Sequence, residues 1–447
     1  MVDSPSPLDA IEAELHRLLS PLLNAPAPDQ PRGRGRPPIL TEALLWSAVT
    51  VCILRQQATQ TAVWRLLCDL GLWNQRIPIT PEGVRRGLQR SDPARMEALF
   101  TQVSTALAPT LTPDRTLAPF ATAVYALDAS TLDAVPRVTA ETRARARGDQ
   151  ALLPGRLSAL FDLRTQQFHR VLLTNQPHEN EKIPAWPITD GLEPGSLLVM
   201  DLGYFAFEWF DALTDAGIWF VTRMQKKATT QPIHRFTDTP DVRDTLVWLG
   251  VYRANRCKHR MRVIEVVVAG KRWRYLTNMT NPQQFSSREI VALYARRWTI
   301  EEAFRLLKVE LGLSVLWSAS WSVVQHQLWG VLLIAQVLLA IRQRIAERAG
   351  VHPDWVAMRL LVRDFPWILR DHPDDPIGFV AGTGVKPHGY LRPPRRTAVT
   401  IPEVPIVPAS PDLPTIRPAR YDHRVHTTAE RRDQRHRAKA KQGLAPN

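Results

Sequence analysis

The sequence has little cysteine and no long uninterrupted hydrophobic run. Its three cysteines, Cys52, Cys68 and Cys257, show no Cys-x-x-Cys spacing and are odd in number, which is typical of a reduced, cytosolic protein. The most apolar stretch, Trp329–Ile341, is interrupted by Gln336 and is too short to span a bilayer, so we expect a buried core helix there. The N-terminus also lacks the basic start and apolar run of a signal peptide.

Acidic residues are the minority charge. The chain has 57 Lys and Arg against 43 Asp and Glu, a formal net charge of +14 at pH 7. Such an excess favours polyanionic partners, with nucleic acid first and an anionic membrane surface second. The alternative is that the charge only reflects a proteome of high average pI. A length of 447 residues with 45% hydrophobic content indicates about two to four units with a sizeable core.

The N-terminal part divides into a flexible segment and a helical unit. Residues 1–40 contain Arg-Gly-Arg-Gly-Arg-Pro-Pro at 32–38, in which Arg34 and Arg36 resemble the core of an AT-hook that enters a narrow minor groove; a solvated basic linker is the alternative. Residues 41–118 have helical periodicity, and we interpret them as a DNA-binding domain. Thr80 and Pro81 predict the start of a basic helix whose Arg85 and Arg86 contact DNA or form a solvated face.

From about residue 119 to 371 the pattern becomes α/β. Residues 226–280 predict a β-rich insertion, in which Arg262–Val268 and Lys271–Thr277 form a hairpin. Helices are expected from Ser286 and over about 321–348. Five short apolar runs are expected to form the strands of the core: Val124–Leu127, Leu157–Phe161, Phe168–Leu173, Leu197–Met200 and Ile218–Thr222.

The C-terminal part, residues 372–447, is dense in proline and ends in a basic stretch. We expect extended, weakly ordered chain here. The basic residues after 417 predict non-specific binding to nucleic acid.

Two aspartates follow apolar runs. Asp128 ends Val-Tyr-Ala-Leu-Asp, and Asp201 directly follows Leu-Leu-Val-Met. A carboxylate that emerges from a buried strand costs free energy unless it is paired or binds a metal, and two on neighbouring strands would suit Mg²⁺. Taken singly, each aspartate is equally well explained as the cap of a following helix.

A helix predicted over Ser286–Leu311 strengthens the metal interpretation. Ser286 and Glu289 form a capping-box pattern, and Gly312 suits the residue after the helix. Four polar residues lie within roughly 60° on one face of such a helix, whereas Glu302 points about 100° away. These four residues are Tyr294, Arg297, Glu301 and Lys308.

This pattern, Tyr-x2-Arg-x3-Glu-x6-Lys after Asp128 and Asp201, resembles the Y-R-E-K signature of bacterial insertion-sequence DDE transposases. The motif Asp201-Leu-Gly-Tyr-Phe205 and the segment Phe220-Val-Thr-Arg223 also match that family. The resemblance covers roughly residues 40–345 and implies an α/β fold: a ribonuclease-H-like mixed sheet with flanking helices and a β-rich insertion. The Arg-Gly-Arg-Pro segment and the C-terminal tail are outside the family pattern.

The resemblance implies two-metal DNA chemistry, with Asp128, Asp201 and Glu301 as catalytic ligands of two Mg²⁺ ions, for which Mn²⁺ can substitute. Arg297 and Lys308 then look like phosphate clamps and Tyr294 like a phosphate hydrogen-bond donor, with Arg223 and Lys226 as further DNA contacts. Trp298 and Trp317 either stack on a distorted base or belong to the core.

The partners expected from the family are the transposon terminal inverted repeats, target DNA and a second copy of the chain in a synaptic homodimer. A cytoplasmic, nucleoid-associated location follows, with no membrane. Two other functions remain open. One is a non-catalytic DNA-binding descendant, against which the intact triad argues, and the other is a stand-alone nuclease of the same fold.

Overall fold

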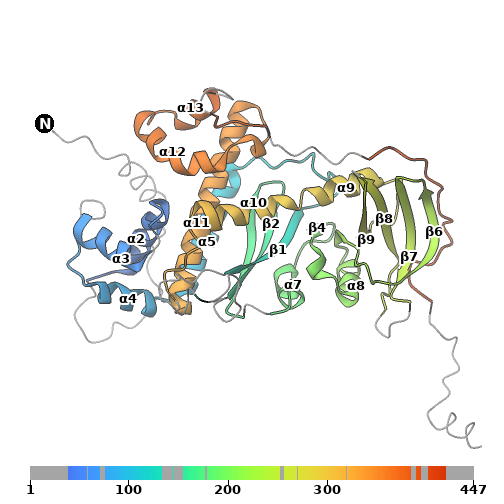
Figure 1. Cartoon of the computed structure of the whole chain (residues 1–447), viewed down its shortest axis with the longest axis horizontal. Coiled ribbons are helices and arrows are strands. Elements are labelled where there is room, and N and C mark those ends of the chain that lie inside the picture. The colour runs from blue at the N-terminus through green and yellow to red at the C-terminus, as the bar shows by residue number, and fades with distance from the viewer. Residues whose placement is uncertain are drawn as a thin grey trace, which may run out of the picture.

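A computed structural model of the chain describes residues 39–57, 59–70, 76–132, 144, 155–176, 179–251, 256–268, 270–318, 320–383, 389–393 and 401–418. The protein is a mixed α/β structure built on one nine-stranded sheet, with the N-terminal helices at one end (Figure 1). The predicted α/β class is therefore confirmed. Arg34 and Arg36 of the hook-like segment lie outside the described residues.

All five apolar runs expected in the core form strands: β1 (Val124–Leu132), β2 (Gly155–Asp162), β3 (Gln167–Thr174), β4 (Leu197–Met200) and β5 (Trp219–Arg223). The first three pair antiparallel as a meander. β4 then pairs parallel with β1, and β5 parallel with β4. Every residue of β4 is buried, as expected for a parallel strand covered on both faces. This arrangement is consistent with a ribonuclease-H-like core.

Four further strands extend the same sheet: β6 (Thr230–Asp238), β7 (Val242–Leu249), β8 (Met261–Val268) and β9 (Lys271–Thr277). They pair antiparallel, and β9 joins β5, so the order is β3-β2-β1-β4-β5-β9-β8-β7-β6. The predicted hairpin is β8–β9, and Gly270 in its turn has a φ of +74°, which glycine adopts at low cost. The β-rich segment therefore continues the core sheet.

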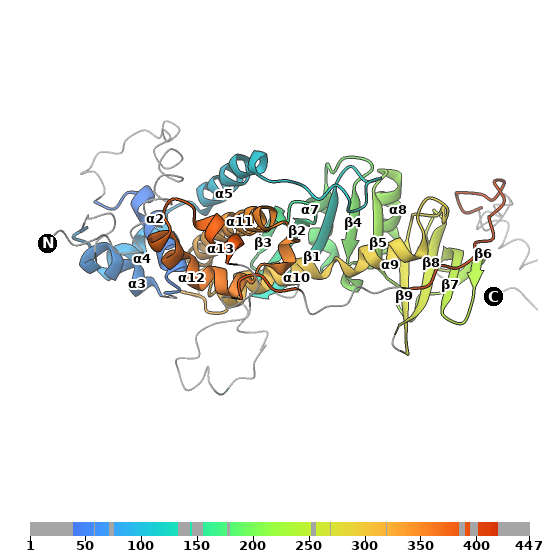
Figure 2. The same cartoon turned by 90° about the horizontal axis from the view of Figure 1, so that it is seen from above.

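Helices cover both faces of the sheet (Figure 2). One face packs on α7 (Lys182–Thr189) and α8 (Phe207–Asp215), and the other on α9 (Ser287–Ala295), α10 (Trp298–Arg305) and α11 (Trp321–Ala349). Because side chains alternate along a strand, Ala126 and Val199 face the α9–α11 layer. Leu127 and Met200 face the α7–α8 layer. By length and composition α11 could cross a membrane, but it is mostly buried as a core helix.

The N-terminal helices are α2 (Glu42–Leu54), α3 (Gln60–Arg65), α4 (Pro81–Arg90) and α5 (Pro93–Leu107). Of these, α2, α4 and α5 pack against α11, and α3 packs on α2 and α4. The predicted start of α4 is confirmed: the Thr80 hydroxyl accepts a hydrogen bond from the Gly83 N–H, and Pro81 opens the first turn. The role of residues 41–118 in binding DNA stays a prediction.

Where the structure describes it, the C-terminal part differs from the weakly ordered chain expected from 372 onward, and the basic stretch after Pro418 lies outside the described residues. After α12 (Met358–Asp371), residues Pro376–Gly382 form α13, capped by the Asp375 side chain. Residues 401–418, called here the strap, lie along the outer edge of the sheet beside β6 (Figure 1). The strap stays in place because its backbone pairs with polar groups of that edge and Ile401 is buried in the core. Composition alone could not predict these partners.

Candidate active site

The two aspartates lie side by side on neighbouring strands, Asp128 in the middle of β1 and Asp201 directly after the end of β4. Leu127 of β1 is paired with Met200 of β4 in parallel register, so the next residues of the two strands are Asp128 and Asp201. Alternation places both carboxylates on the face that α9 and α10 cover. The two acids therefore lie next to each other on one face of the buried sheet.

The helical segment that crosses these strands is broken, contrary to the single helix predicted over Ser286–Leu311. The capping box at Ser286 and Glu289 is present, but α9 ends at Ala295 and α10 begins at Trp298, followed by a π-helical turn over Leu306–Glu310. α9 lies over β4 and β5, whereas α10 lies over β1. The break therefore lets consecutive turns reach different strands of the site.

Side chains from both pieces converge on the aspartates. The Tyr294 hydroxyl, from the end of α9, donates to Asp201 Oδ1 at 3.3 Å. Arg297, at the break, places Nη1 3.4 Å from Asp128 Oδ2 and Nη2 2.6 Å from Glu301 Oε1. The Arg297 guanidinium thus bridges a strand carboxylate and a helix carboxylate.

Burial and charge shift the ionisation of this cluster. Burial raises the pKa of Asp128 to about 6, and the negative charges of Asp201 and Glu301 add to that effect against the opposing Arg297. Burial also opposes the charge of Arg297, but Tyr294 and the two carboxylates outweigh it and raise its pKa. The site therefore concentrates negative charge, and the Arg297 guanidinium contacts two of its carboxylates directly.

These carboxylates fit a hard divalent cation by donor type and by charge. Among the residues that the structure describes, no three acidic, His or Cys side chains are close enough to hold a metal ion as they stand. Arg297 fills the space between Asp128 and Glu301 instead. Oxygen ligands suit Mg²⁺ or Mn²⁺, and the mutual repulsion of the acids would be relieved by a cation.

Glu302 is directed elsewhere. Its charge acts on the buried Arg342 of α11, whereas the charges acting on Asp128 are those of Asp201, Glu301 and Arg297. The structure thus brings Glu301 to the aspartates and leaves Glu302 apart from them.

One group at the site was missed by sequence reasoning. Glu181, just before α7, forms an ion pair with Arg156 of β2, and its carboxylate packs so tightly on Gly203 that a Cβ there would overlap it. The neighbouring Tyr204 is buried, and burial together with the charges of Asp128 and Glu181 raises its pKa. Gly203 lies in the tight turn Leu202–Tyr204 after Asp201, and the close approach of Glu181 leaves no room for a side chain there.

The other predicted DNA contacts lie around this cluster. The Arg223 guanidinium stacks over Trp273 of β9, 4.8 Å from its ring centre, and Tyr275 on the same face of β9 contacts the Tyr294 ring at 5.1 Å between centroids. Trp273 was also missed, although it alternates with Tyr275 in a strand-like pattern. Lys226 is exposed beyond β5.

The remaining candidates are dispersed. Trp298, at the start of α10, is 41% exposed, and Lys308 is half-buried in the π-helical turn. Trp317 packs against the core, which was its alternative assignment. Arg85 and Arg86 on α4 both bond to Glu82 and belong to the N-terminal helices, apart from the carboxylates.

Comparisons with known proteins agree with this geometry. Residues 119–338 match the family described as transposase DDE domain. The chain is also 26% identical over 325 residues to the transposase InsG for insertion sequence element IS4 of Escherichia coli strain K12, covering 68% of this chain and 70% of that protein. Asp128, Asp201 and Glu301 all lie inside the matched segment.

Proposed function

Since residues 119–338 of this chain belong to the transposase DDE domain family, we propose that the chain cuts DNA at transposon ends and joins the freed 3′-hydroxyl to target DNA. The observation that carries the proposal is the arrangement of Asp128, Asp201 and Glu301 around Arg297 and Tyr294 beneath the α9–α10 break. Three carboxylates with an arginine and a phenol among them suit phosphoryl transfer, in which positioning and charge supply most of the catalysis.

The three carboxylates would hold two Mg²⁺ ions, or Mn²⁺ in their place. When bound, such ions activate the attacking oxygen and stabilise the leaving oxygen. Arg297 would then turn from the carboxylates to a DNA phosphate, which its fork of donors can bind at two points. Tyr294 keeps Asp201 oriented by its hydrogen bond and can also donate to a phosphate oxygen.

The surroundings of the site would hold the DNA. Lys308, Arg223 and Lys226 are positively charged and would bind backbone phosphates, whereas the exposed face of Trp298 suits a base displaced from the stack. The helices of residues 41–118, with Arg85 and Arg86, and the Arg34–Arg36 linker would bind the terminal inverted repeats. A homodimer would pair the two ends, in the cytoplasm and in association with the nucleoid.

A plasmid assay tests the proposal. The substrate is supercoiled DNA that carries the sequences flanking the coding region, incubated with the protein and Mg²⁺ or Mn²⁺. The wild-type chain should nick and join these ends, and Asp128→Ala, Asp201→Ala and Glu301→Ala should each abolish both steps while end binding persists. Glu302→Ala is the matched control on the same helix and should retain activity.

Two outcomes would contradict the proposal. Strand transfer by any of the three alanine variants would remove that residue from the chemistry. Cutting without joining of the 3′-hydroxyl would identify a nuclease rather than a transposase.

A further inference from the structure

Arg296 precedes Arg297 at the helix break but has different partners. Its Nη2 donates to His352 Nε2 at 2.9 Å. The same guanidinium lies 3.6 Å from Asp354 and 3.9 Å from Asp114. Two adjacent arginines are therefore anchored separately, one by the carboxylates of the site and the other by this second group, called here the Arg296 cluster (Arg296, Asp114, His352 and Asp354).

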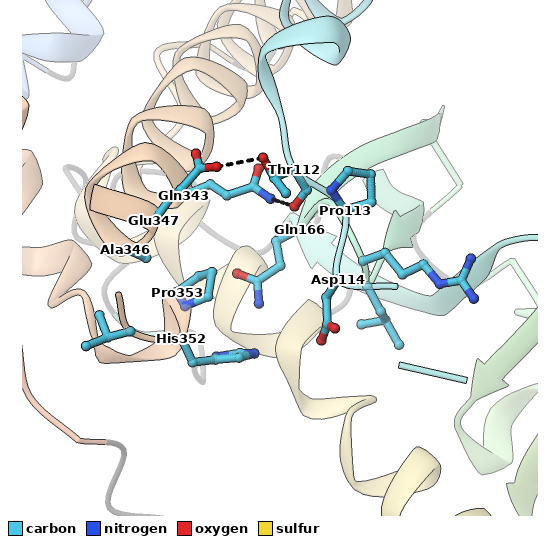
Figure 3. A pocket seen from close by; sticks show the side chains of 12 residues that line it. Thr112, Pro113, Asp114, Gln166, Gln343, Ala346, Glu347, His352 and Pro353 are labelled. Carbon is cyan, nitrogen blue, oxygen red and sulfur yellow. Dashed lines mark hydrogen bonds between the residues drawn. The ribbon is translucent and has the colours of Figure 1, made fainter. Parts of the chain in front are cut away.

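The Arg296 cluster joins segments that are distant in sequence. Asp114 precedes β1, and His352 and Asp354 follow α11. Gln166, in the β2–β3 turn, donates to Asp354 at 3.2 Å and accepts a hydrogen bond from the buried Arg342. Figure 3 shows Asp114, Gln166 and His352 facing a common pocket beside α11.

The backbone conformation of Gln166 indicates that the segment around Asp354 and His352 is rigid. Its backbone has a φ of +53°, a left-handed conformation that costs free energy for a residue with a side chain. Such a conformation persists when the surroundings fix it, and Gln166 is buried. The partners of Arg296 therefore belong to a rigid part of the protein.

The break itself has no local cause in the sequence. Neither proline nor glycine occurs between Tyr294 and Glu301, although these residues account for most sharp helix kinks. The backbone instead forms three-residue hydrogen bonds there, from the Arg297 N–H to the Tyr294 carbonyl and from the Ile300 N–H to the Arg297 carbonyl. Both residues of this turn, Arg296 and Arg297, are held by side chains from other segments of the chain.

We propose that Arg296 is a positioning residue for the proposed reaction. Held by Asp114, His352 and Asp354, it fixes the break between α9 and α10 and so sets where Arg297 and Glu301 meet Asp128. Arg296 does not contact the reacting atoms; it acts through its neighbour. The inference rests on the proposed function of the carboxylate site.

Four variants test the inference. Arg296→Gln and His352→Leu each remove the anchor, whereas His352→Gln keeps an acceptor facing Arg296. The matched control is Thr112→Val, which removes a hydrogen bond to Glu347 in the same pocket and leaves the Arg296 cluster intact. Four quantities are measured for each: Mn²⁺ binding by electron paramagnetic resonance, affinity for end DNA, single-turnover cleavage at saturating end DNA, and the midpoint of thermal unfolding.

Arg296→Gln and His352→Leu should lower the single-turnover rate about 10- to 100-fold, because small misplacements of a catalytic group cost this much. Both should weaken Mn²⁺ binding, while affinity for end DNA stays at the wild-type level. His352→Gln should recover most of the rate, and Thr112→Val should match the wild type.

Unchanged rates and Mn²⁺ binding in Arg296→Gln would overturn the inference. So would equal losses in His352→Leu and His352→Gln, or losses that only follow the unfolding midpoint and recur in Thr112→Val. A wild-type protein that neither binds Mn²⁺ nor cuts DNA would instead refute the proposed function itself. The two failures are therefore distinguishable.

Discussion

Asp128 differs from an exposed aspartate because it is buried beside two other acids. An aspartate in the unfolded chain titrates near pH 4, whereas burial raises the pKa of folded Asp128 to about 6. The folded state therefore holds this proton more tightly than the unfolded state. It follows that this group makes the protein less stable as the pH rises from about 4 to above 6.

Asp128→Asn should abolish that dependence. In a chelating buffer, the unfolding midpoint of the variant should match the wild type near pH 4 and exceed it by a growing margin up to about pH 7, because asparagine has no charge to desolvate. Thermal unfolding of both proteins across this pH range measures the margin. A margin that is constant with pH, or that shrinks, would contradict the predicted ionisation.

Gly203 shows a constraint that sequence could not reveal. It lies in a tight turn two residues after Asp201, and the carboxylate of Glu181 also packs against its Cα. Glu181 and Arg156 are far from each other and from Asp201 along the chain, and no local pattern connects them. Contacts of this kind appear only once the strands have been placed.

Gly203→Ala should therefore destabilise the protein by about 1–3 kcal/mol, the usual cost of overpacking. In a Glu181→Ala background, the same substitution should cost markedly less, because the carboxylate that it would overlap is gone. Urea unfolding of the wild type, the two single variants and the double variant gives the four free energies of a double-mutant cycle. Strictly additive effects would show that the two residues do not constrain each other.

At the scale of elements, the sequence predicted whether a segment is a helix or a strand better than it predicted where a helix breaks. The five core strands were predictable because their runs are continuously apolar, and the start of α4 because Thr80 and Pro81 form a local signal. The helix over Ser286–Leu311 was predicted as continuous, since its sequence has no proline or glycine before Gly312. Its break depends on partners of Arg296 and Arg297 that lie far away in the chain. The spacing nevertheless placed Tyr294, Arg297 and Glu301 on the side of the aspartates, as the structure has them, and their catalytic roles stay predictions.

One buried ion pair joins the outer strands to the helix of the site. Arg262 of β8 donates Nε to Asp244 Oδ1 at 2.8 Å and Nη2 to Oδ2 at 2.5 Å, and both side chains are fully buried. The Ser287 hydroxyl, in the first turn of α9, donates to the same carboxylate at 2.7 Å. The start of α9 is thus tied to β7 and β8.

Asp244→Ala should lower the free energy of unfolding by about 3–5 kcal/mol, because it leaves the Arg262 charge buried without its partner. Asp238→Ala is the control: it removes an aspartate paired with Arg235 and Arg243 at the surface, where a loss of about 0–1 kcal/mol is usual. Guanidinium unfolding of both variants compares them. Equal losses would mean that burial does not govern the contribution of the pair.

At the scale of the whole molecule, the strap is the largest departure from expectation. Proline density predicted weak order, but the Val407 N–H bonds to the Phe236 carbonyl at 2.8 Å, and the Thr237 hydroxyl bonds to the Pro405 carbonyl at 2.7 Å. Proline is compatible with extended chain beside an edge strand, where not every backbone N–H needs a partner. The strap thereby covers β6, which would otherwise be an exposed edge.

Removal of the strap should therefore promote self-association. A chain that ends at residue 400 should form oligomers or aggregates through β6, whereas a chain that ends at residue 418 should behave like the full protein. Size-exclusion chromatography with light scattering compares them at several concentrations. A monodisperse shorter chain with the mass distribution of the longer one would show that the strap is not needed to protect the edge.

The continuity of the nine-stranded sheet also limits how this protein can change in evolution. Because β9 is hydrogen-bonded directly to β5, the inserted strands are not joined to the core by a hinge. A change of length where they join the core would disrupt the hydrogen bonds between β5 and β9. Length variation is tolerated at the far turns, between β6 and β7 or between β8 and β9, whereas the connection between β7 and β8 is bonded to α8 through Lys258 and His259. Those turns are the places at which relatives should gain or lose residues, and at which a foreign segment can be grafted.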